Sequence, residues 1–121
     1  MHKFAIYPIE DVRFELEFET FQVNVETGEI ELYDDNRELI GILARQHIAA
    51  IVPSELRPTE RLDMFTFSVY IKNHIDDPIM LNATDLRNRP AYTFFIDRRP
   101  VRSLYLDPQQ VTAITFRPTN S

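Results

Sequence analysis

One short pattern in this chain returns once, 63 positions further on, and this recurrence constrains the fold more than any other feature. Residues 46–52 read QHIAAIV, and residues 109–115 read QQVTAIT. At the same offset, residues 4–51 align with residues 67–114 without a gap. The identical pairs are Phe4/Phe67, Tyr7/Tyr70, Asp34/Asp97, Leu43/Leu106, Gln46/Gln109, Ala50/Ala113 and Ile51/Ile114. The recurrence predicts one small unit that is built twice.

The match depends more on the placement of turns than on the number of identities. Apolar residues exchange for apolar residues at positions such as Ile6/Val69 and Phe18/Leu81. The turn-forming segment 34–36, which reads Asp-Asp-Asn, falls on segment 97–99, which also begins with aspartate. Because turns fall on turns as well as core positions on core positions, we interpret the recurrence as an internal duplication.

Residues 13–19 alternate strictly between polar and apolar side chains, which is typical of a half-buried strand. The side chains expected on its core face are Phe14, Leu16 and Phe18. The alternation continues one step out of phase through Phe21, Val23 and Val25. A shift of one residue reverses the faces of a strand, so the sequence predicts a bulge or sharp bend at residues 19–20.

Residues 37–50 fit either one helix or two strands. Asp35 and Glu38 have the spacing of a capping box, which would start a helix. Against the helix, Pro108 lies opposite Arg45 in the aligned repeat and would break a helix at that place. If both halves fold alike, the chain here forms a strand over residues 38–43, a single turn over 44–47 and a second strand from residue 48.

Turn-forming residues divide the rest of the chain into short strands. Gly28 ends a tight hairpin loop and is expected to have a positive φ. Asp107 and Pro108 predict a single helical turn, with the aspartate as cap and the proline at the first position. The strands expected in the second half are residues 65–71, 79–81, 91–96, 101–106 and 111–116, with turns at residues 76–78 and 97–100.

These elements indicate an all-β protein. We expect two tandem, related, small β-barrel or sandwich-like units of about five strands each, packed into one body, with single-turn helices only. The acidic first unit spans residues 1–57 and the arginine-richer second unit spans residues 58–121, unless the two form one continuous domain. Because a unit of this size is marginally stable alone, we expect the two to pack around a pseudo-twofold axis. The order of elements resembles the small SH3-like and Sm-like barrels in outline, which concerns the fold and implies no function.

The composition narrows the class of protein. A chain of 121 residues with 44% hydrophobic and 26% charged residues is typical of a globular protein. The absence of cysteine removes disulfides, thiolate metal sites and cysteine nucleophiles. The sequence has no signal peptide and no apolar run near the roughly 20 residues that span a bilayer, so we expect a cytoplasmic protein without membrane contact.

Charge is distributed unevenly along the chain. The net charge is −6, which argues against sequence-independent nucleic-acid binding because phosphate contacts need a positive face. Residues 1–62 carry 13 acidic and 6 basic side chains, whereas residues 63–121 carry 6 acidic and 7 basic ones. The first half is therefore strongly acidic and the second is nearly neutral, so any function that depends on charge involves two surfaces of different charge.

No standard catalytic pattern is present, since the sequence has no glycine-rich phosphate loop, nucleophile elbow or paired-histidine zinc helix. We therefore expect no enzymatic activity and no cofactor. His74 and Asp76 are weak candidates for a metal site, because alternation would direct both to the same side. A turn before Pro78 explains these residues equally well. His47, beside apolar residues, is interpreted as structural rather than catalytic.

Two charged faces are the candidate interaction sites. The acidic face consists of Glu15, Glu17, Glu19, Glu29 and Glu31, with the last two expected near the first three across a sheet. Like charges opposite one another are unfavourable, which favours a surface for a basic partner, whereas solvation and edge protection are the alternative. The basic face consists of Arg87, Arg89, Arg98, Arg99 and Arg102, interleaved with Tyr92, Phe94 and Phe95.

The leading hypothesis is a non-enzymatic protein-interaction or assembly module, which self-associates into a homo-oligomer or docks a protein partner through these two faces. Opposite charge on two similar units suits head-to-tail contact between chains. The alternative is an anion-binding protein that holds a nucleotide or nucleic acid on the Arg87–Arg102 cluster by charge and stacking. A hydrolase or metalloenzyme built around His74 and Asp76 is the third hypothesis.

Overall fold

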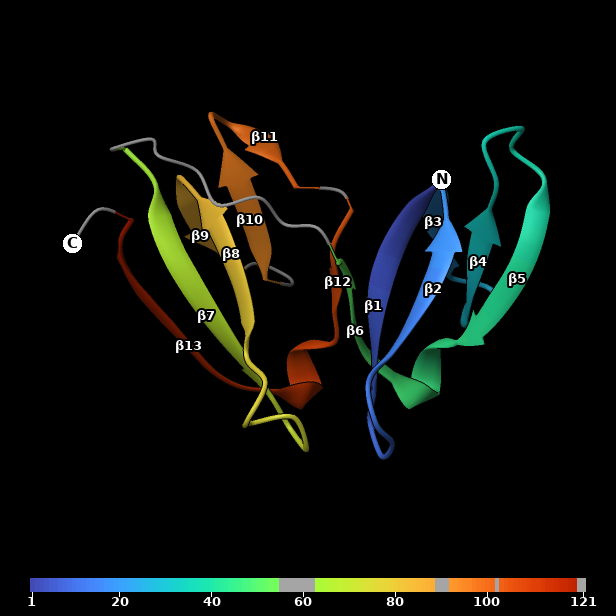
Figure 1. Ribbon diagram of the computed structural model, residues 1–121, viewed down its shortest axis with the longest axis horizontal. Coiled ribbons are helices and arrows are strands. Elements are labelled where there is room, and N and C mark those ends of the chain that lie inside the picture. The colour runs from blue at the N-terminus through green and yellow to red at the C-terminus, as the bar shows by residue number, and fades with distance from the viewer. Residues whose placement is uncertain (55–62, 89–91, 102, 120–121) are drawn as a thin grey trace.

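The computed structural model describes residues 1–54, 63–88, 92–101 and 103–119 of the chain (Figure 1). Within these residues the regular elements are strands and two helical turns of three residues each. The prediction of an all-β protein with single-turn helices only is therefore confirmed. The strands form several small sheets, and no closed barrel is found among them.

The elements of the first half, in chain order, are β1 (His2–Pro8), β2 (Phe14–Phe18), β3 (Thr20–Asn24), β4 (Glu29–Tyr33), β5 (Leu39–Ala44), η1 (Arg45–His47) and β6 (Ile48–Pro53). The elements of the second half are β7 (Phe65–Ile71), β8 (Ile79–Ala83), β9 (Asp85–Arg87), β10 (Thr93–Ile96), β11 (Arg99–Pro100), β12 (Tyr105–Leu106), η2 (Pro108–Gln110) and β13 (Val111–Pro118).

Each half is an antiparallel meander that is bent in its middle. In the first half β1 pairs with β2 and β6, and β4 pairs with β3 and β5. Glu19 alone separates β2 from β3, so these are two parts of one bent strand. In the second half β7 pairs with β8 and β13, β10 pairs with β9 and β11, and Thr84 alone separates β8 from β9. The order of pairing is the same in both halves, although their common origin stays a prediction.

The two meanders also agree in their position along the chain. β1 and β7 begin and end 63 residues apart, and so do η1 and η2. The last strand of each half contains a β-bulge, that is, one extra residue without a partner on the neighbouring strand. This residue is Ala49 opposite β1 and Thr112 opposite β7. These bulges are again 63 positions apart, so the alignment of the sequence pairs equivalent positions of the two meanders.

The sheet β12-β6-β1-β2 lies at the middle of the molecule and is shared by two hydrophobic cores (Figure 1). The first core contains Phe4, Ile6, Phe18, Ile30, Leu32, Ile48 and Ile51. The second core contains Ala5, Tyr7, Ala49, Ala50, Val52, Phe67, Val69, Ile71, Ile79, Leu81, Ala83, Phe94 and Leu106. Successive residues of β1 point to opposite faces of the sheet, and both faces are covered. This double covering explains why β1 and β6 read as continuous apolar runs.

The two copies of the recurring pattern have opposite environments. In the first copy, all residues from Ile48 to Val52 are buried within β6. In the second copy, β13 is the edge of the sheet β13-β7-β8, and most of its side chains are exposed. Its most exposed large apolar side chain is Phe116, at 65%. One pattern therefore supplies the centre of the molecule in one half and its outer edge in the other.

Several local predictions are confirmed. The bend falls at Glu19, and Gly28 has a φ of +72° in the hairpin between β3 and β4. Residues 37–53 form a strand, one helical turn and a second strand, so the single long helix is wrong. Asp107 caps η2, because its carboxylate accepts a hydrogen bond from the backbone N–H of Gln109, and Pro108 occupies the first helical position.

Other predictions need correction. Val25 is 85% exposed because β3 ends at Asn24, whose side-chain oxygen accepts hydrogen bonds from the backbone of the following turn. Phe14 is 41% exposed rather than buried, because it lies at the start of β2 on the edge of the central sheet.

The segment expected as one strand over residues 101–106 is also different. Val101 donates a hydrogen bond to Phe94 and extends the hairpin of β10 and β11, whereas only Tyr105 and Leu106 form β12, on β6. The turn expected over residues 97–100 is shorter in the structure, because Arg99 and Pro100 form β11 and pair with β10. The expected unit boundary between residues 57 and 58 lies outside the described residues.

Candidate interaction site at two open sheet edges

The bent meanders leave one strand at each end of the molecule with an open side. β5 is the outer strand of the sheet β3-β4-β5, and β13 is the outer strand of the sheet β13-β7-β8. Figure 1 shows them at opposite ends of the longest axis, β5 at the right and β13 at the left. Within the part of the chain that the structure describes, no strand pairs with the outer side of either one. We call residues 39–44 the β5 edge and residues 111–117 the β13 edge.

The β5 edge exposes large apolar side chains. Leu39 and Ile42 are each 51% exposed, and Ile40 is 47% exposed. The strand follows a turn in which the Asp34 carboxylate accepts hydrogen bonds from the backbone N–H groups of Asn36 and Glu38. The unpaired backbone N–H and C=O groups of an edge strand are a template for pairing with another chain, and exposed apolar side chains favour that pairing. Lysine, the usual protection of such an edge, is absent from this strand.

The β13 edge combines an open backbone with one exposed aromatic ring. The Phe116 ring packs edge-on against Phe65 and tilted against Phe67, at centroid distances of 5.8 and 5.6 Å. Its outer side remains exposed. Ile114 is half-buried against the second core, and Ala113 beside it is exposed. This strand therefore presents a small alanine, a β-branched side chain and an aromatic ring in sequence.

The junction between the halves shows how an edge of this kind is closed. β12 pairs antiparallel with β6, with Tyr105 opposite Ile51 and Leu106 opposite Ala50. The backbone N–H of Asp107 donates to the Ala49 carbonyl at 2.8 Å. β6 is the last strand of the first meander, as β13 is of the second. A strand from the second half thus covers the edge in the first half that corresponds to the β13 edge.

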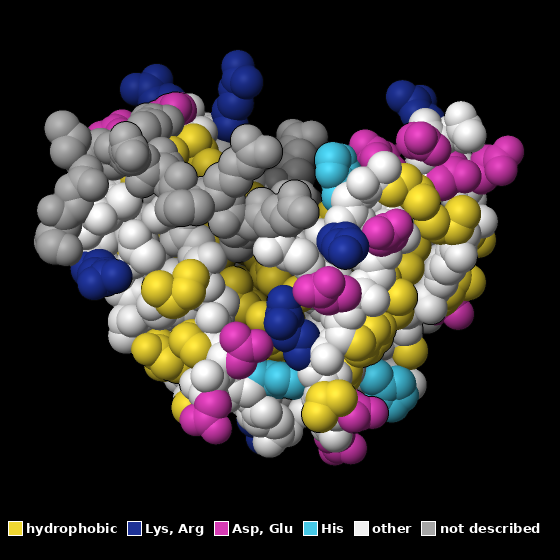
Figure 2. Space-filling model, in the orientation of Figure 1, with side chains coloured by type: hydrophobic (Ala, Val, Ile, Leu, Met, Phe, Trp, Pro, Cys, Tyr) yellow, Lys and Arg dark blue, Asp and Glu magenta, His cyan; other side chains and the backbone are white. Residues whose placement is uncertain are grey.

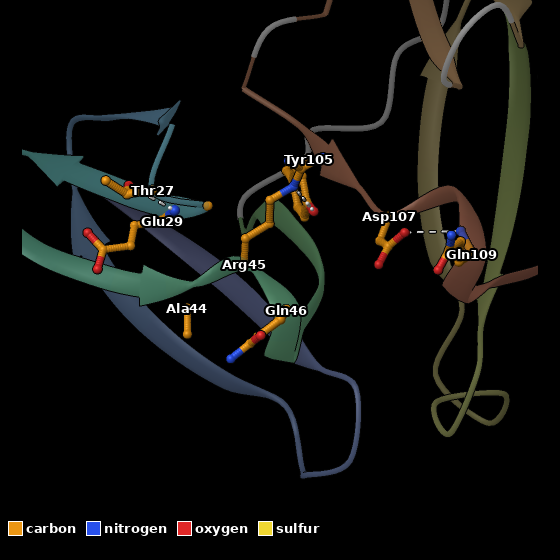
Figure 3. Close-up of a pocket in the computed structure, with 9 residues that line it drawn as sticks. Thr27, Glu29, Ala44, Arg45, Gln46, Tyr105, Asp107 and Gln109 are labelled. Atoms are coloured by element: carbon orange, nitrogen blue, oxygen red, sulfur yellow. Dashed lines mark hydrogen bonds between the residues drawn. The ribbon is translucent and has the colours of Figure 1, made fainter. Parts of the chain in front are cut away.

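A polar pocket of about 470 Å³ lies beside this junction (Figure 3). Its lining residues are Thr27, Gly28, Glu29, Ala44, Arg45, Gln46, Tyr105, Asp107 and Gln109. Arg45 points toward Tyr105, and its Nε donates to the phenol oxygen at 3.4 Å. The hydrogen bond and the charge interaction with Tyr105 raise the pKa of Arg45, so its guanidinium stays charged. The pocket ties the two halves together through Arg45 and Tyr105.

The acidic face is divided between two sheets. Glu15 and Glu17 lie on β2, which pairs with β1, whereas Glu29 and Glu31 lie on β4, which pairs with β3 and β5. The expectation that the two groups are neighbours across one sheet is therefore wrong. Glu19 lies at the bend between β2 and β3. The reason is this bend, which sends the two parts of one strand into different sheets.

Some of these carboxylates have local partners. Arg13 lies 3.4 Å from Glu15, His2 lies 3.5 Å from Glu19, and Glu31 accepts a hydrogen bond from the Tyr33 hydroxyl at 3.2 Å. Figure 2 shows acidic side chains on the surface over the half that contains β1–β6, together with hydrophobic ones. Exposed ion pairs of this kind contribute little stability, roughly 0–1 kcal/mol.

The basic face is also spread out. Arg87 on β9 lies opposite Thr93, at one end of β10, and Arg99 on β11 lies opposite Ile96, at the other end. Arg87 pairs with Asp85 at 3.3 Å and lies over the Phe95 ring at 4.9 Å, so its charge already has a partner. Arg98 occupies the turn before β11 with a φ of +74°. Arg89 and Arg102 lie outside the described residues.

Of the described arginines in this cluster, Arg98 and Arg99 are the two exposed cations for which the structure gives no carboxylate partner. The hypothesis of an anion-binding protein depends on these two side chains.

Of the two weak metal candidates, His74 contacts residues of the first half. His74 Nε2 lies 2.7 Å from the carbonyl oxygen of Pro8, and the His74 ring packs edge-on against Tyr7 at 5.2 Å. Asn73 beside it donates to the Ile9 carbonyl at 2.6 Å. Asp76 lies in the turn before β8. Among the residues that the structure describes, no three His, Asp or Glu side chains gather where they could hold a metal ion.

The fold and the site define an all-β protein in which the outer strands β5 and β13 each have an unpaired side. No protein-family model, no curated protein and no solved structure matches the chain. Among the described residues, no helix has the length and apolar character needed to cross a membrane.

The open edges were missed by the sequence reasoning, although the sequence contains a signal for one of them. Leu39, Ile40 and Ile42 are apolar with little polar alternation, which is unusual for a strand with one face in water. The sequence predicts a strand over residues 38–43 and does not predict which of its side chains are exposed. Phe116 gave no signal, because it alternates with Thr115 and Arg117 as an inward residue would.

Proposed function

We propose that this chain is a non-enzymatic assembly module, which associates with further copies of itself or with a protein partner through its open sheet edges. The observation that carries this proposal is the pair of unpaired outer strands, β5 and β13, at opposite ends of the molecule. An extended segment can add to such an edge by backbone hydrogen bonds, while side chains on alternate positions give specificity.

The exposed apolar side chains support an interaction rather than simple solvation. Ile42 and Phe116 are 51% and 65% exposed, and each lies on an outer strand. Single exposed apolar residues are ordinary on protein surfaces, but several on one unpaired strand mark an interaction site. Both edges are already extended strands that pair with a neighbour on their inner side, which lowers the conformational entropy lost when a further strand is added.

The difference in charge supports contact between unlike ends. Residues 1–62 have a net charge of −7 and residues 63–121 a net charge of +1. Complementary charge speeds encounter and disfavours the pairing of like ends. In this proposal the acidic face (Glu15, Glu17, Glu19, Glu29 and Glu31) and the exposed arginines orient the partners, and the sheet edges hold them. The proposal includes an origin of the two halves by duplication and a cytoplasmic location, which the lack of cysteine permits.

Sedimentation velocity of the purified chain tests the proposal. We compare the wild type with Ile42→Lys and Phe116→Lys, because lysine on an edge strand opposes pairing. Val25→Lys is the matched control, since this side chain is 85% exposed and lies in the turn between β3 and β4, outside both edge strands. Each protein is measured from about 1 to 100 µM, at about 0.1 and 1 M salt, because screening shortens the reach of charge interactions.

We expect the wild type and Val25→Lys to form assemblies that weaken at high salt, and both edge variants to shift toward the monomer. A wild type that stays monomeric throughout this range contradicts self-association. Assemblies that persist in both edge variants contradict the role of the edges. Docking of another protein predicts that a complex purified with the wild-type chain is lost in Ile42→Lys or Phe116→Lys and kept in Val25→Lys.

A further inference from the structure

We propose that the partner is a second copy of this chain, and that β5 of one copy lies antiparallel on β13 of the next in the register that β12 adopts on β6. This inference rests on the proposed function and makes it specific. It names the occupant of both edges, the direction of the strands and the residues that face each other.

The internal junction is the template for this contact. β12 lies 63 positions after Ile42 and Leu43 of β5. Asp107 alone separates β12 from η2, and β5 lies directly before η1. β12 closes the outer side of β6, the last strand of the other meander. Within one chain the contact therefore joins the segment of the second unit that is equivalent to the end of β5, which pairs with β6 and not with β10, to the last strand of the first unit. The fifth strand of the first unit and the last strand of the second unit, β5 and β13, are left over.

The offset of 63 converts the internal register into the register between copies. Tyr105 opposite Ile51 becomes Ile42 opposite Ile114. Leu106 opposite Ala50 becomes Leu43 opposite Ala113. The hydrogen bond from the Asp107 N–H to the Ala49 carbonyl becomes one from the Ala44 N–H to the carbonyl of Thr112. Thr112 is the bulge residue of β13, just as Ala49 is that of β6, so the backbone has the same local shape at both places.

Side-chain directions agree with this register. In the junction, Tyr105 and Ile51 pack on the first core, while Leu106 and Ala50 belong to the second core, which is the core of the unit that supplies β12.

At the open edges, Leu43 packs on the core of its own unit, and Ile114 packs on the core of its own unit. A contact in the proposed register would place Ile42 beside Ile114, over the second core of the neighbouring copy. This is the position that Tyr105 has over the first core.

The exposed surface is what such a contact would cover. Ala50 is 0% exposed beneath β12, whereas Ala113 at the equivalent place is exposed. Ile42 is 51% exposed, and Ile40 and Phe116 lie further along the two strands at 47% and 65%. β5 and β13 lie at opposite ends of the molecule, so they cannot pair within one chain (Figure 1). The contact is heterologous, and it closes into a ring or continues as a filament.

Disulfide trapping tests the register, because the natural chain contains no cysteine. One pair of variants is Leu43→Cys and Ala113→Cys, and a second is Ala44→Cys and Thr112→Cys. In the second pair both side chains are exposed, so neither substitution removes core packing. A disulfide needs Cα atoms within about 7 Å of each other. The mismatched control is Ala44→Cys with Thr115→Cys, because three residues along a strand displace the partner by about 10 Å.

We mix singly substituted chains at about 50 µM with oxidised glutathione and separate them on a non-reducing gel. The expected result is a linked dimer in each matched mixture, at least tenfold more than in the mismatched mixture or in any variant alone. The double variant Ala44→Cys/Thr112→Cys should give a ladder of linked chains. A ladder that ends at a fixed size indicates a ring, and one without a limit indicates a filament; both agree with the contact.

Linkage of Leu43→Cys or Ala44→Cys with itself would overturn the inference, because it would show that β5 pairs with β5. Equal linkage in the matched and mismatched mixtures would overturn the register. Sedimentation separates this failure from failure of the proposed function. Assemblies that lose mass in Ile42→Lys, without matched linkage, would keep the proposed function with a different contact. A chain that is monomeric and unlinked would refute both.

Discussion

Ile51 and Ile114 are the same residue at the same position of the two meanders, and their environments make them a matched test of the shared central sheet. Ile51 is 0% exposed and lies between Ile6 on β1 and Tyr105 on β12. Ile114 is half-buried on a strand with an open side. Truncation of each to alanine removes the same atoms from two places that the sequence repeat treats as equal.

The structure predicts very different costs. Ile51→Ala removes three carbon atoms at about 0.8 kcal/mol each. Because both faces of the sheet are covered, the vacated space cannot be filled by water or by a small shift of one core. The cavity raises the loss in unfolding free energy to about 3–4 kcal/mol. Ile114→Ala leaves a dent at the surface, and half of the transfer loss gives about 1 kcal/mol.

The assay is urea unfolding followed by far-UV circular dichroism, together with thermal unfolding. Both truncations are made in the Ile42→Lys background, so that association does not add to stability. For a domain of this size about 4 °C of melting temperature corresponds to 1 kcal/mol, so we expect a decrease of about 12–16 °C for Ile51→Ala and about 4 °C for Ile114→Ala. Equal decreases would refute the double covering of β6, and with it the closure of that edge by β12.

Three further predictions concern how the halves are joined. Phe18→Ala and Phe94→Ala lie in different cores, and each should shift one common unfolding transition because the cores share a sheet; two separable transitions would contradict this. Burial raises the pKa of Tyr7 above its usual value of 10, with Asp77 adding to the effect and Arg13 opposing it. The folded state therefore opposes ionisation of Tyr7, so the contribution of this group to stability is complete below pH 10 and is lost at higher pH. Tyr7→Phe should lose less unfolding free energy between pH 9 and 11.5 than the wild type does. Parallel curves of unfolding free energy against pH would contradict the burial of Tyr7. Asn73 has a φ of +68° and donates to Ile9, so Asn73→Gly keeps the backbone and should cost about 1 kcal/mol in urea unfolding, whereas no loss would show that this bond does not tie the halves.

Local structure is predictable from the sequence where a residue type restricts the backbone to one conformation. The sequence predicts a positive φ for Gly28 in a hairpin, and the phase of the alternation predicts the strand change at Glu19; the structure has both. Pro108 excludes a long helix for residues 37–50, although this segment contains no proline. Pro108 aligns with Arg45 in the repeat, and if both halves fold alike, neither can have a long helix through this place. Each of these inferences needs only neighbours along the chain or the repeat itself.

The remaining features depend on contacts that no local pattern records. Whether Ile42 or Phe116 is buried depends on which sheet lies over it, and periodicity describes only which residues share a face. The acidic face was misplaced for the same reason, since the bend at Glu19 changes which strands are neighbours. The pairing of β12 with β6 joins residues 54 and 56 positions apart through two amino acids, Tyr105 and Leu106. A strand of two residues is too short to recognise from the sequence.

The shared central sheet also determines how this protein can be made. β1 and β6 leave the ribosome before β7, and at that moment one face of their sheet has no cover. The apolar side chains on that face become buried only when Phe67 and the rest of the second core pack against them; these side chains are Ala5, Tyr7, Ala50 and Val52. A chain that ends after β6 would leave this apolar face exposed to water and aggregate, even if its first core were fully packed. The half that is synthesised first therefore becomes a stable structure only when the second half has been completed.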